Sequence, residues 1–380
     1  MTDLTQDDEA VTATVARPDG TYRLRTRYLV GADGGHSVTR KLSGIEFPGV
    51  TRDDTVSRTM TAAPPADWID PRTGALNVPG YGVIPPLMHH RTEAGLFVYA
   101  PFPGRPAAVV TTEYDIPRDT SAPLTLAEMK ESIRRVVGVD VPVTPPPGDG
   151  PHLQRRLVGT NTRLAERFRD WRALLVGDAA HVHSATGGRG LNLGLQDTIN
   201  LGWKLAAVIR DDAREKLLDS YEAERRPVGQ RVIMHTQAQS ALNAPGADVT
   251  ALRELFGELL TDPRNIQHIA ETMAGSDVRY ETTGHPLTGR FAPDMDLHTA
   301  SGPARLAQLT RDARPLLLDM TETGLPSDGP WQLVRADARP EQATALLLRP
   351  DTYVAWASSA ARPDAAEIDE LRAATARWFG

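Results

Sequence analysis

The 380-residue sequence contains no cysteine. Disulfides, thiolate metal sites, iron–sulfur clusters and dithiol redox chemistry within the chain are therefore excluded. Lysine is scarce as well, because four of the 42 basic residues are lysines and the other 38 are arginines. These residues are scattered and are outnumbered by 49 acidic residues, which gives a formal net charge of −7. This charge balance argues against a nucleic-acid or anionic-membrane partner.

Long apolar runs are also missing from the sequence. No stretch approaches the roughly 18 apolar residues that a membrane-spanning helix requires. The first ten residues, MTDLTQDDEA, are acidic and polar, unlike a secretory signal. We therefore expect a cytoplasmic protein with no membrane partner. Hydrophobic residues make up 40% of the chain, which is ordinary for a globular protein, and the length predicts two or three domains.

Periodicity and turn residues predict the main elements of the chain. A β-hairpin is expected over 11–30, around the turn Pro18–Thr21, and short strands broken by proline and glycine over 50–114. Helices are expected over 126–137, 164–169, 191–210, 217–241 and 252–273. The tail changes character from 285 onward, with four predicted strands followed by a helix over 365–378.

The most informative stretch runs from Leu174 to Ala206, LLVGDAAHVHSATGGRGLNLGLQDTINLGWKLA. A buried strand ends at Gly177-Asp178, and a glycine-rich loop leads into a helix. The loop matches neither the phosphate-binding GxxxxGK[ST] nor the dinucleotide-binding GxGxxG pattern. A carboxylate at the carboxyl end of such a strand lies where α/β proteins bind ligands, and it suits a sugar-type hydroxyl. Asp178 is equally consistent with a helix-capping or loop-closing role.

The glycines of this loop point to an anion or to a ring whose reduced form is anionic. Gly187, Gly188 and Gly190 allow backbone N–H groups to converge just before the helix. A helix N-terminus carries a partial positive charge and free donors. His181 and His183, with Asp178, raise the alternative of a metal site. Because no other clustered ligand set accompanies them, we predict that no metal is bound.

These residues resemble those of a known family. The stretch above, followed by YEAERRP, resembles the GD motif and next helices of class A flavoprotein aromatic hydroxylases, which are FAD- and NAD(P)H-dependent monooxygenases of the para-hydroxybenzoate hydroxylase fold. YLVGADGGHSVTRKLSGIEFPG resembles the DG motif of the same family. GRFAPDMDL and LLLRPDTYVAW resemble the thioredoxin-like C-terminal domain of its subgroup acting on phenols and aromatic polyketides.

The resemblance implies an α/β fold: an incomplete FAD/NAD(P)-binding Rossmann-like domain, an inserted, mostly antiparallel β substrate domain and a C-terminal thioredoxin-like domain. The implied boundaries are 1–49 and 151–284 for the FAD-binding domain, 50–150 for the substrate-binding sheet and 285–380 for the C-terminal domain.

It also implies the roles of site residues. Asp178 would bind the ribityl chain of FAD, and the start of the following helix would present backbone donors to the flavin pyrimidine. Asp33 and Gly34 would tie the DG loop to the pyrophosphate side, and His36 and Arg40 match positions associated with the nicotinamide cofactor. The full set of implied cofactor-binding residues is Asp33, Gly34, His36, Arg40, Asp178, Gly187, Gly188, Gly190, Leu191 and Asn192.

The chemistry would belong to the cofactor, as a flavin C4a-hydroperoxide made from O2 that hydroxylates an aromatic small molecule, so no catalytic side chain is assigned. The substrate pocket is expected between the middle sheet and the flavin, near Tyr81, Pro85, Phe97 and Tyr99. Homodimer formation is left open.

Two departures from the family pattern shape the expectations. Ser184-Ala185-Thr186 stands where the family usually has proline, and no GxGxxG occurs in the sequence. We therefore expect the adenine half of the FAD site to be missing, FAD to bind poorly, and unpaired strand edges at 28–30 and 174–176. The alternative function is a catalytically inactive flavoprotein remnant that binds aromatic ligands or a partner chain.

Overall fold

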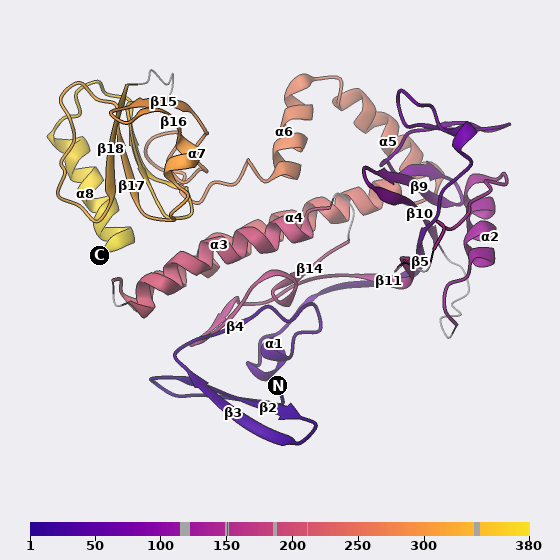
Figure 1. The fold of residues 1–380 in the computed structure, drawn as a ribbon, viewed down its shortest axis with the longest axis horizontal. Helices are drawn as coiled ribbons and strands as arrows, with labels where there is room; N and C mark the ends of the chain where they lie inside the picture. The colour runs from indigo at the N-terminus through magenta and orange to yellow at the C-terminus, as the bar shows by residue number, and fades with distance from the viewer. Residues whose placement is uncertain (115–121, 149, 151, 185–187, 211, 338–342) are drawn as a thin grey trace.

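The computed structural model describes residues 1–114, 122–148, 150, 152–184, 188–210, 212–337 and 343–380. The middle sheet with helix α2 (Leu126–Val137) and a C-terminal sheet with helices α7 (Leu306–Leu309) and α8 (Ala365–Phe379) lie on opposite sides of Figure 1. The long helices α3 (Gly190–Ile209) and α4 (Asp219–Asn243) run between them. This arrangement has the α/β class expected from the sequence. Within the described residues, no helix is both long enough and apolar enough to cross a membrane.

The N-terminal part begins with a three-stranded antiparallel sheet. Its strands are β1 (Asp3–Gln6), β2 (Val11–Arg17) and β3 (Gly20–Thr26). Arg17 pairs with Gly20, so the predicted hairpin is present and turns through Pro18 and Asp19. The chain continues into β4 (Leu29–Gly31) and the short helix α1 (Val38–Leu42).

Strand β4 belongs to a small sheet that carries both predicted motifs. It pairs in parallel with β13 (Ala173–Leu175), and β13 pairs on its other side with β12 (Arg169–Asp170). The expected unpaired edge at 174–176 is therefore wrong, because β13 is bonded on both sides and its residues are fully buried. Strand β4 is paired on one side only within the described chain, and Val30 is 38% exposed.

The middle sheet has six strands in the order β14-β11-β5-β10-β9-β8, all antiparallel. Their bounds are β5 Gly49–Thr61, β8 His90–Thr92, β9 Gly95–Phe102, β10 Arg105–Tyr114, β11 Gln154–Leu164 and β14 His181–Val182. Beside it lie η1 (Ala66–Trp68) and the hairpin β6 (Leu76–Val78) and β7 (Gly82–Ile84). Helix α2 (Leu126–Val137) packs Met129 and Ile133 into its core. Through β14 the sheet reaches the loop after β13.

The helical segment follows that loop. It consists of α3 (Gly190–Ile209), η3 (Glu215–Leu218), α4 (Asp219–Asn243), α5 (Ala247–Leu259) and α6 (Pro263–Ala274). The single helix predicted over 252–273 is wrong, because Asp262 caps a new helix that begins at Pro263. The helix predicted over 164–169 is also wrong, since β11 ends at Leu164 and β12 begins at Arg169.

The C-terminal part forms a second six-stranded sheet in the order β16-β15-β18-β17-β19-β20. Its elements are β15 Asp296–Thr299, β16 Gly302–Arg305, α7 Leu306–Leu309, β17 Leu316–Asp319, β18 Gln332–Asp337, β19 Ala345–Leu348, β20 Val354–Ser358 and α8 Ala365–Phe379. Strands β17 and β19 are leucine-rich and completely buried between two apolar clusters.

Candidate cofactor site

The GD loop, defined as residues 177–184, begins where β13 ends. Gly177 takes the left-handed φ of +60°, and Asp178 follows in the short 3-10 helix η2 (Gly177–Ala179). The loop packs closely against helix α3, because a Cβ added at Gly194 would lie 3.2 Å from the Cα of Gly177. Asp178 itself is exposed and accepts no hydrogen bond from any described residue. Its carboxylate is therefore free to accept from a ligand hydroxyl at the carboxyl end of the strand.

The start of helix α3 supplies donors next to this carboxylate. Gly188 has a φ of +66°, and no side-chain cap bonds the start of the helix among the described residues. The first N–H groups of a helix have no intrahelical partner, so these donors are open to a ligand. Leu191 and Asn192 are exposed in this first turn. The positive end of the helix dipole favours an anionic group there. Gly187 lies outside the described residues.

The DG loop (residues 33–37) uses its aspartate to begin helix α1. The Asp33 carboxylate accepts from Ser37 Oγ at 2.5 Å and from the backbone N–H groups of Val38 and Thr39, both at 2.9 Å. Although partial burial opposes it, these hydrogen bonds lower the pKa of Asp33. Asp33 thus shapes the loop, while Gly34 makes its turn with a φ of +79°.

Arg40 joins the two motifs. Its buried guanidinium donates to the carbonyl oxygen of Ala179 at 2.9 Å and to that of Gly35 at 3.0 Å, and it lies 3.7 Å from the centre of the Phe47 ring. Burial lowers its pKa. These contacts hold the DG loop against the GD loop, so Arg40 has a structural role, whereas the side chain of His36 is exposed. His36 borders a cavity of about 330 Å³ that is lined also by Arg40 and Arg163.

Both histidines of the GD loop have partners other than a metal. His181 is fully buried, and its Nε2 lies 2.6 Å from the Asp197 carboxylate. His183 Nδ1 lies 2.8 Å from the carbonyl oxygen of Ser184, and burial lowers the pKa of this imidazole. Across the described residues, no group of three histidine, aspartate or glutamate side chains could hold a metal ion.

Three buried polar atoms beside the GD loop have no hydrogen-bond partner in the described chain. They are Nδ1 of His181, Nε2 of His183 and Nη1 of Arg189. Buried polar atoms are normally satisfied, so each of these atoms marks a place where a polar ligand or water is needed. Together with the free Asp178 carboxylate and the open helix start, these atoms fit the ribityl and pyrimidine half of a flavin.

The four predicted substrate residues fall into two groups. Phe97 and Tyr99 are buried in the apolar core between the middle sheet and α2, and this packing accounts for both. Tyr81 is 36% exposed, and its hydroxyl lies 2.5 Å from His90 Nε2. Pro85 is exposed at the end of the adjoining hairpin. The structure therefore leaves Tyr81 and Pro85 accessible to a ligand.

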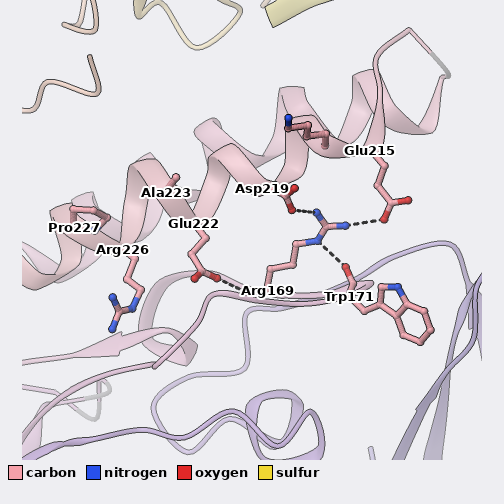
Figure 2. A pocket seen from close by; sticks show the side chains of 9 residues that line it. Arg169, Trp171, Glu215, Asp219, Glu222, Ala223, Arg226 and Pro227 are labelled. Atoms are coloured by element: carbon pink, nitrogen blue, oxygen red, sulfur yellow. Dashed lines mark hydrogen bonds and ion pairs between the residues drawn. The ribbon is translucent and has the colours of Figure 1, made fainter. Parts of the chain in front are cut away.

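A cavity of about 760 Å³ lies at the opposite end of β13 (Figure 2). Figure 2 shows Arg169 bonded to Glu215 and Asp219, with Trp171 at the side of the groove. Because these charges are already paired and the cavity adjoins the amino end of the strand, it does not fit the cofactor site.

The sequence predicts no role for Asp197 or Arg225, which are completely buried behind the GD loop. The available signal was a polar stripe on the buried face of α3. Asp197, Asn200 and Lys204 recur at helical spacing among buried leucines, where an ordinary amphipathic helix has apolar side chains.

Comparisons with known proteins agree with this geometry. Residues 1–236 match the family model for an FAD binding domain, and residues 285–380 match that for the C-terminal part of aromatic-ring hydroxylases. The 12-dehydrotetracycline 5-monooxygenase/anhydrotetracycline 6-monooxygenase of Streptomyces rimosus is 39% identical over 100% of this chain and 75% of its own length. A rifampicin monooxygenase of Streptomyces venezuelae is 36% identical over 99% of this chain and 73% of its own.

Solved structures give the same result. The anhydrotetracycline hydroxylase of Streptomyces rimosus superimposes with a TM-score of 0.80 at 34% identity, covering 99% of this chain and 74% of that one. The coverage and identity of these matches, with the joined DG and GD loops, show that the chain belongs to the family of FAD-dependent aromatic-ring monooxygenases.

Proposed function

We propose that the protein hydroxylates a polycyclic phenol of the aromatic polyketide class, with NAD(P)H as the electron donor. One aromatic C–H bond becomes C–OH, and the second oxygen atom of O2 leaves as water with the electrons of NAD(P)H. Reduced FAD would supply the activation of O2. The observation that carries the proposal is the free Asp178 carboxylate beside the open start of α3, in a chain similar to a monooxygenase named for anhydrotetracycline.

The protein's own residues would hold and orient the cofactor. Asp178 would accept hydrogen bonds from the ribityl hydroxyls, and the first N–H groups of α3, from Gly190 to Asn192, would stabilise negative charge on the pyrimidine. His36, exposed in the DG loop, remains the candidate for nicotinamide contact, and Tyr81 and Pro85 remain the candidates for substrate contact. The sequence has no GxGxxG for the pyrophosphate, so the fit extends to the flavin half only.

We extend the proposal to the domain division inferred from the sequence. It has an FAD-binding domain over 1–49 and 151–284, a substrate-binding sheet over 50–150 and a thioredoxin-like C-terminal domain over 285–380. The two family-model matches, over 1–236 and 285–380, support the last boundary.

The test is turnover with isotopically labelled O2. The protein is supplied with FAD, with NADH or NADPH, and with anhydrotetracycline or simpler phenols, and the products are analysed by mass spectrometry. We expect a product that carries one labelled oxygen atom, and we expect one NAD(P)H to be oxidised for each product molecule formed. Bound FAD with no labelled product from any of these phenols would contradict the proposal and favour a catalytically inactive flavoprotein.

A further inference from the structure

A continuous chain of polar side chains, all buried except the half-buried Tyr280, connects the GD loop with the C-terminal sheet. We call it the Asp197 network, and it comprises His181, Asp197, Arg225, Tyr280 and Tyr353. Asp197 lies on α3, Arg225 on α4, Tyr280 after α6 and Tyr353 immediately before β20. His181, Asp197 and Arg225 are at most 1% exposed.

Asp197 holds the GD loop on both sides of Asp178. Its Oδ2 accepts from the Gly177 backbone N–H at 3.2 Å and from His181 Nε2 at 2.6 Å. Although burial raises its pKa, the contacts with His181 and Arg225 lower it, so Asp197 is a carboxylate in the folded protein. One ionised side chain therefore fixes the loop residues that flank Asp178, whose own carboxylate faces outward.

Arg225 carries this connection from α3 to the linker after α6. Its Nε donates to Asp197 Oδ1 at 2.8 Å, and its Nη1 donates to the Tyr280 hydroxyl at 2.9 Å. The buried guanidinium thus binds both Asp197 and Tyr280. Because a buried charge that loses a partner is costly, we expect a change at Tyr280 to affect the contact with Asp197 as well. Tyr280 in turn stacks on Tyr353, with the ring centres 4.3 Å apart.

We propose that Asp197 is a positioning residue for the GD loop, and that Arg225 and Tyr280 make this position depend on the docked C-terminal sheet. The Asp197 network thereby gives the C-terminal sheet influence over the geometry around Asp178, although its strands contribute no residue to the loop. Only the consequence for flavin rests on the proposed function, since the coupling itself is a property of the protein alone.

The first experiment measures amide hydrogen exchange of the 177–184 peptide without flavin. Tyr280→Phe removes only the hydroxyl that accepts from Arg225. We expect faster exchange in this peptide by about three- to tenfold, because losing one buried hydrogen bond shifts a local opening equilibrium by that factor. Tyr114→Phe is the matched control, since it removes a hydroxyl bonded to the carbonyl oxygen of Asn243 at 3.3 Å, away from the network. This control should leave the 177–184 peptide unchanged.

Asp197→Asn, which keeps the shape and one carbonyl acceptor but removes the charge, should raise the exchange of this peptide more than Tyr280→Phe does. Unchanged exchange in Tyr280→Phe would overturn the proposal. An equal rise in the buried strands β17 and β19 would overturn it as well, because that result means global destabilisation. Titration with FAD then separates the coupling through the Asp197 network from the assignment of the GD loop to flavin. Faster exchange in the loop with unaltered FAD affinity supports the coupling and contradicts the assignment of the loop to flavin.

Discussion

At the scale of single residues, Trp171 occupies a backbone conformation that suits glycine. It has a φ of +55° in the turn between β12 and β13, and its side chain, labelled in Figure 2, has an exposed fraction of 51%. The left-handed region costs a residue with a Cβ about 1–2 kcal/mol. We predict that Trp171→Gly raises the free energy of unfolding by about 1 kcal/mol, after allowing for the greater freedom of glycine in the unfolded chain. Urea denaturation measures this, with Trp171→Ala as the control that keeps the Cβ and should gain little. Equal stability of the Gly and Ala variants would show that the turn carries no strain.

Asp178 is the residue on which flavin binding is expected to depend most. Its carboxylate is exposed and accepts no hydrogen bond from a described residue, so removing it should cost the ligand rather than the fold. We predict that Asp178→Ala weakens FAD binding by about 1.5–3 kcal/mol, which is about ten- to a hundredfold in Kd. Fluorescence titration measures the affinity, and Asp369→Ala, which removes an exposed carboxylate on α8, serves as the control. An Asp178→Ala protein with the affinity of the parent would exclude the ribityl contact.

Residue roles could be predicted from sequence where local geometry decides them. Asp178 and Gly188 are predicted as site residues from the sequence because a strand, a carboxylate and a glycine-rich helix start follow one another within a few residues. Asp197 and Arg225 were not, because their bond joins residues 28 positions apart and the next bond, to Tyr280, spans 55 positions. Only packing brings those partners together, so the polar stripe on α3 indicates that Asp197 is buried but does not identify its partners.

At the scale of elements, helix-capping residues explain why one predicted helix has the expected bounds and another does not. Helix α2 has the predicted bounds, because Thr125 accepts from the Glu128 N–H at 3.2 Å and Gly138 ends the helix in the left-handed conformation. The same chemistry explains the wrong prediction over 252–273, where Asp262 and Pro263 start a second helix within a continuous apolar pattern. The spacing of apolar residues alone does not reveal where one helix ends and the next begins.

The contribution of the Thr125 cap to the stability of α2 can be measured. Thr125→Ala should lower the free energy of unfolding by about 1 kcal/mol, because it leaves the first turn of α2 without its side-chain acceptor. Thr125→Ser keeps the hydroxyl and should stay within a few tenths of a kcal/mol of the parent protein. Urea denaturation measures both variants. If the Ala and Ser variants have the same stability, the cap contributes nothing to α2.

At the scale of the whole molecule, a buried ionic cluster attaches the C-terminal sheet to helices α3 and α4. Arg349, 2% exposed by its side chain, donates to Glu224 at 2.5 Å and to Asp351 at 2.5 Å, and Lys204 donates to Glu224 at 2.7 Å. Trp378 covers the Arg349 guanidinium at 4.3 Å from the ring centre. The sequence predicted the elements on both sides of this contact but not the contact, since its partners lie 125 residues apart.

The ionisation of Glu224 makes the stability of this contact depend on pH. Although burial raises the pKa of Glu224, the charges of Arg349 and Lys204 lower it from 4.5 to about 2. Because the folded pKa is depressed, the stabilisation is fully present above pH 4.5 and is lost as the pH falls toward 2, a change of about 3 kcal/mol. Asn200 Nδ2 donates to this carboxylate at 2.6 Å and lies 3.5 Å from Oδ2 of Asp351, so a neutral donor contacts Glu224 and a second acid lies beyond it.

Glu224→Gln should therefore remove this part of the acid dependence while lowering stability near neutral pH by about 3–5 kcal/mol, since it breaks a buried pair. Urea denaturation between pH 2 and 7, followed by tryptophan fluorescence because Trp378 and Trp203 adjoin Arg349, measures both effects. Glu322→Gln removes the partner of Arg362 in a pair exposed to solvent, so it should leave the curve unchanged. A Glu224→Gln protein that loses stability on acidification as steeply as the parent would mean that Glu224 is not the group whose protonation releases the C-terminal sheet.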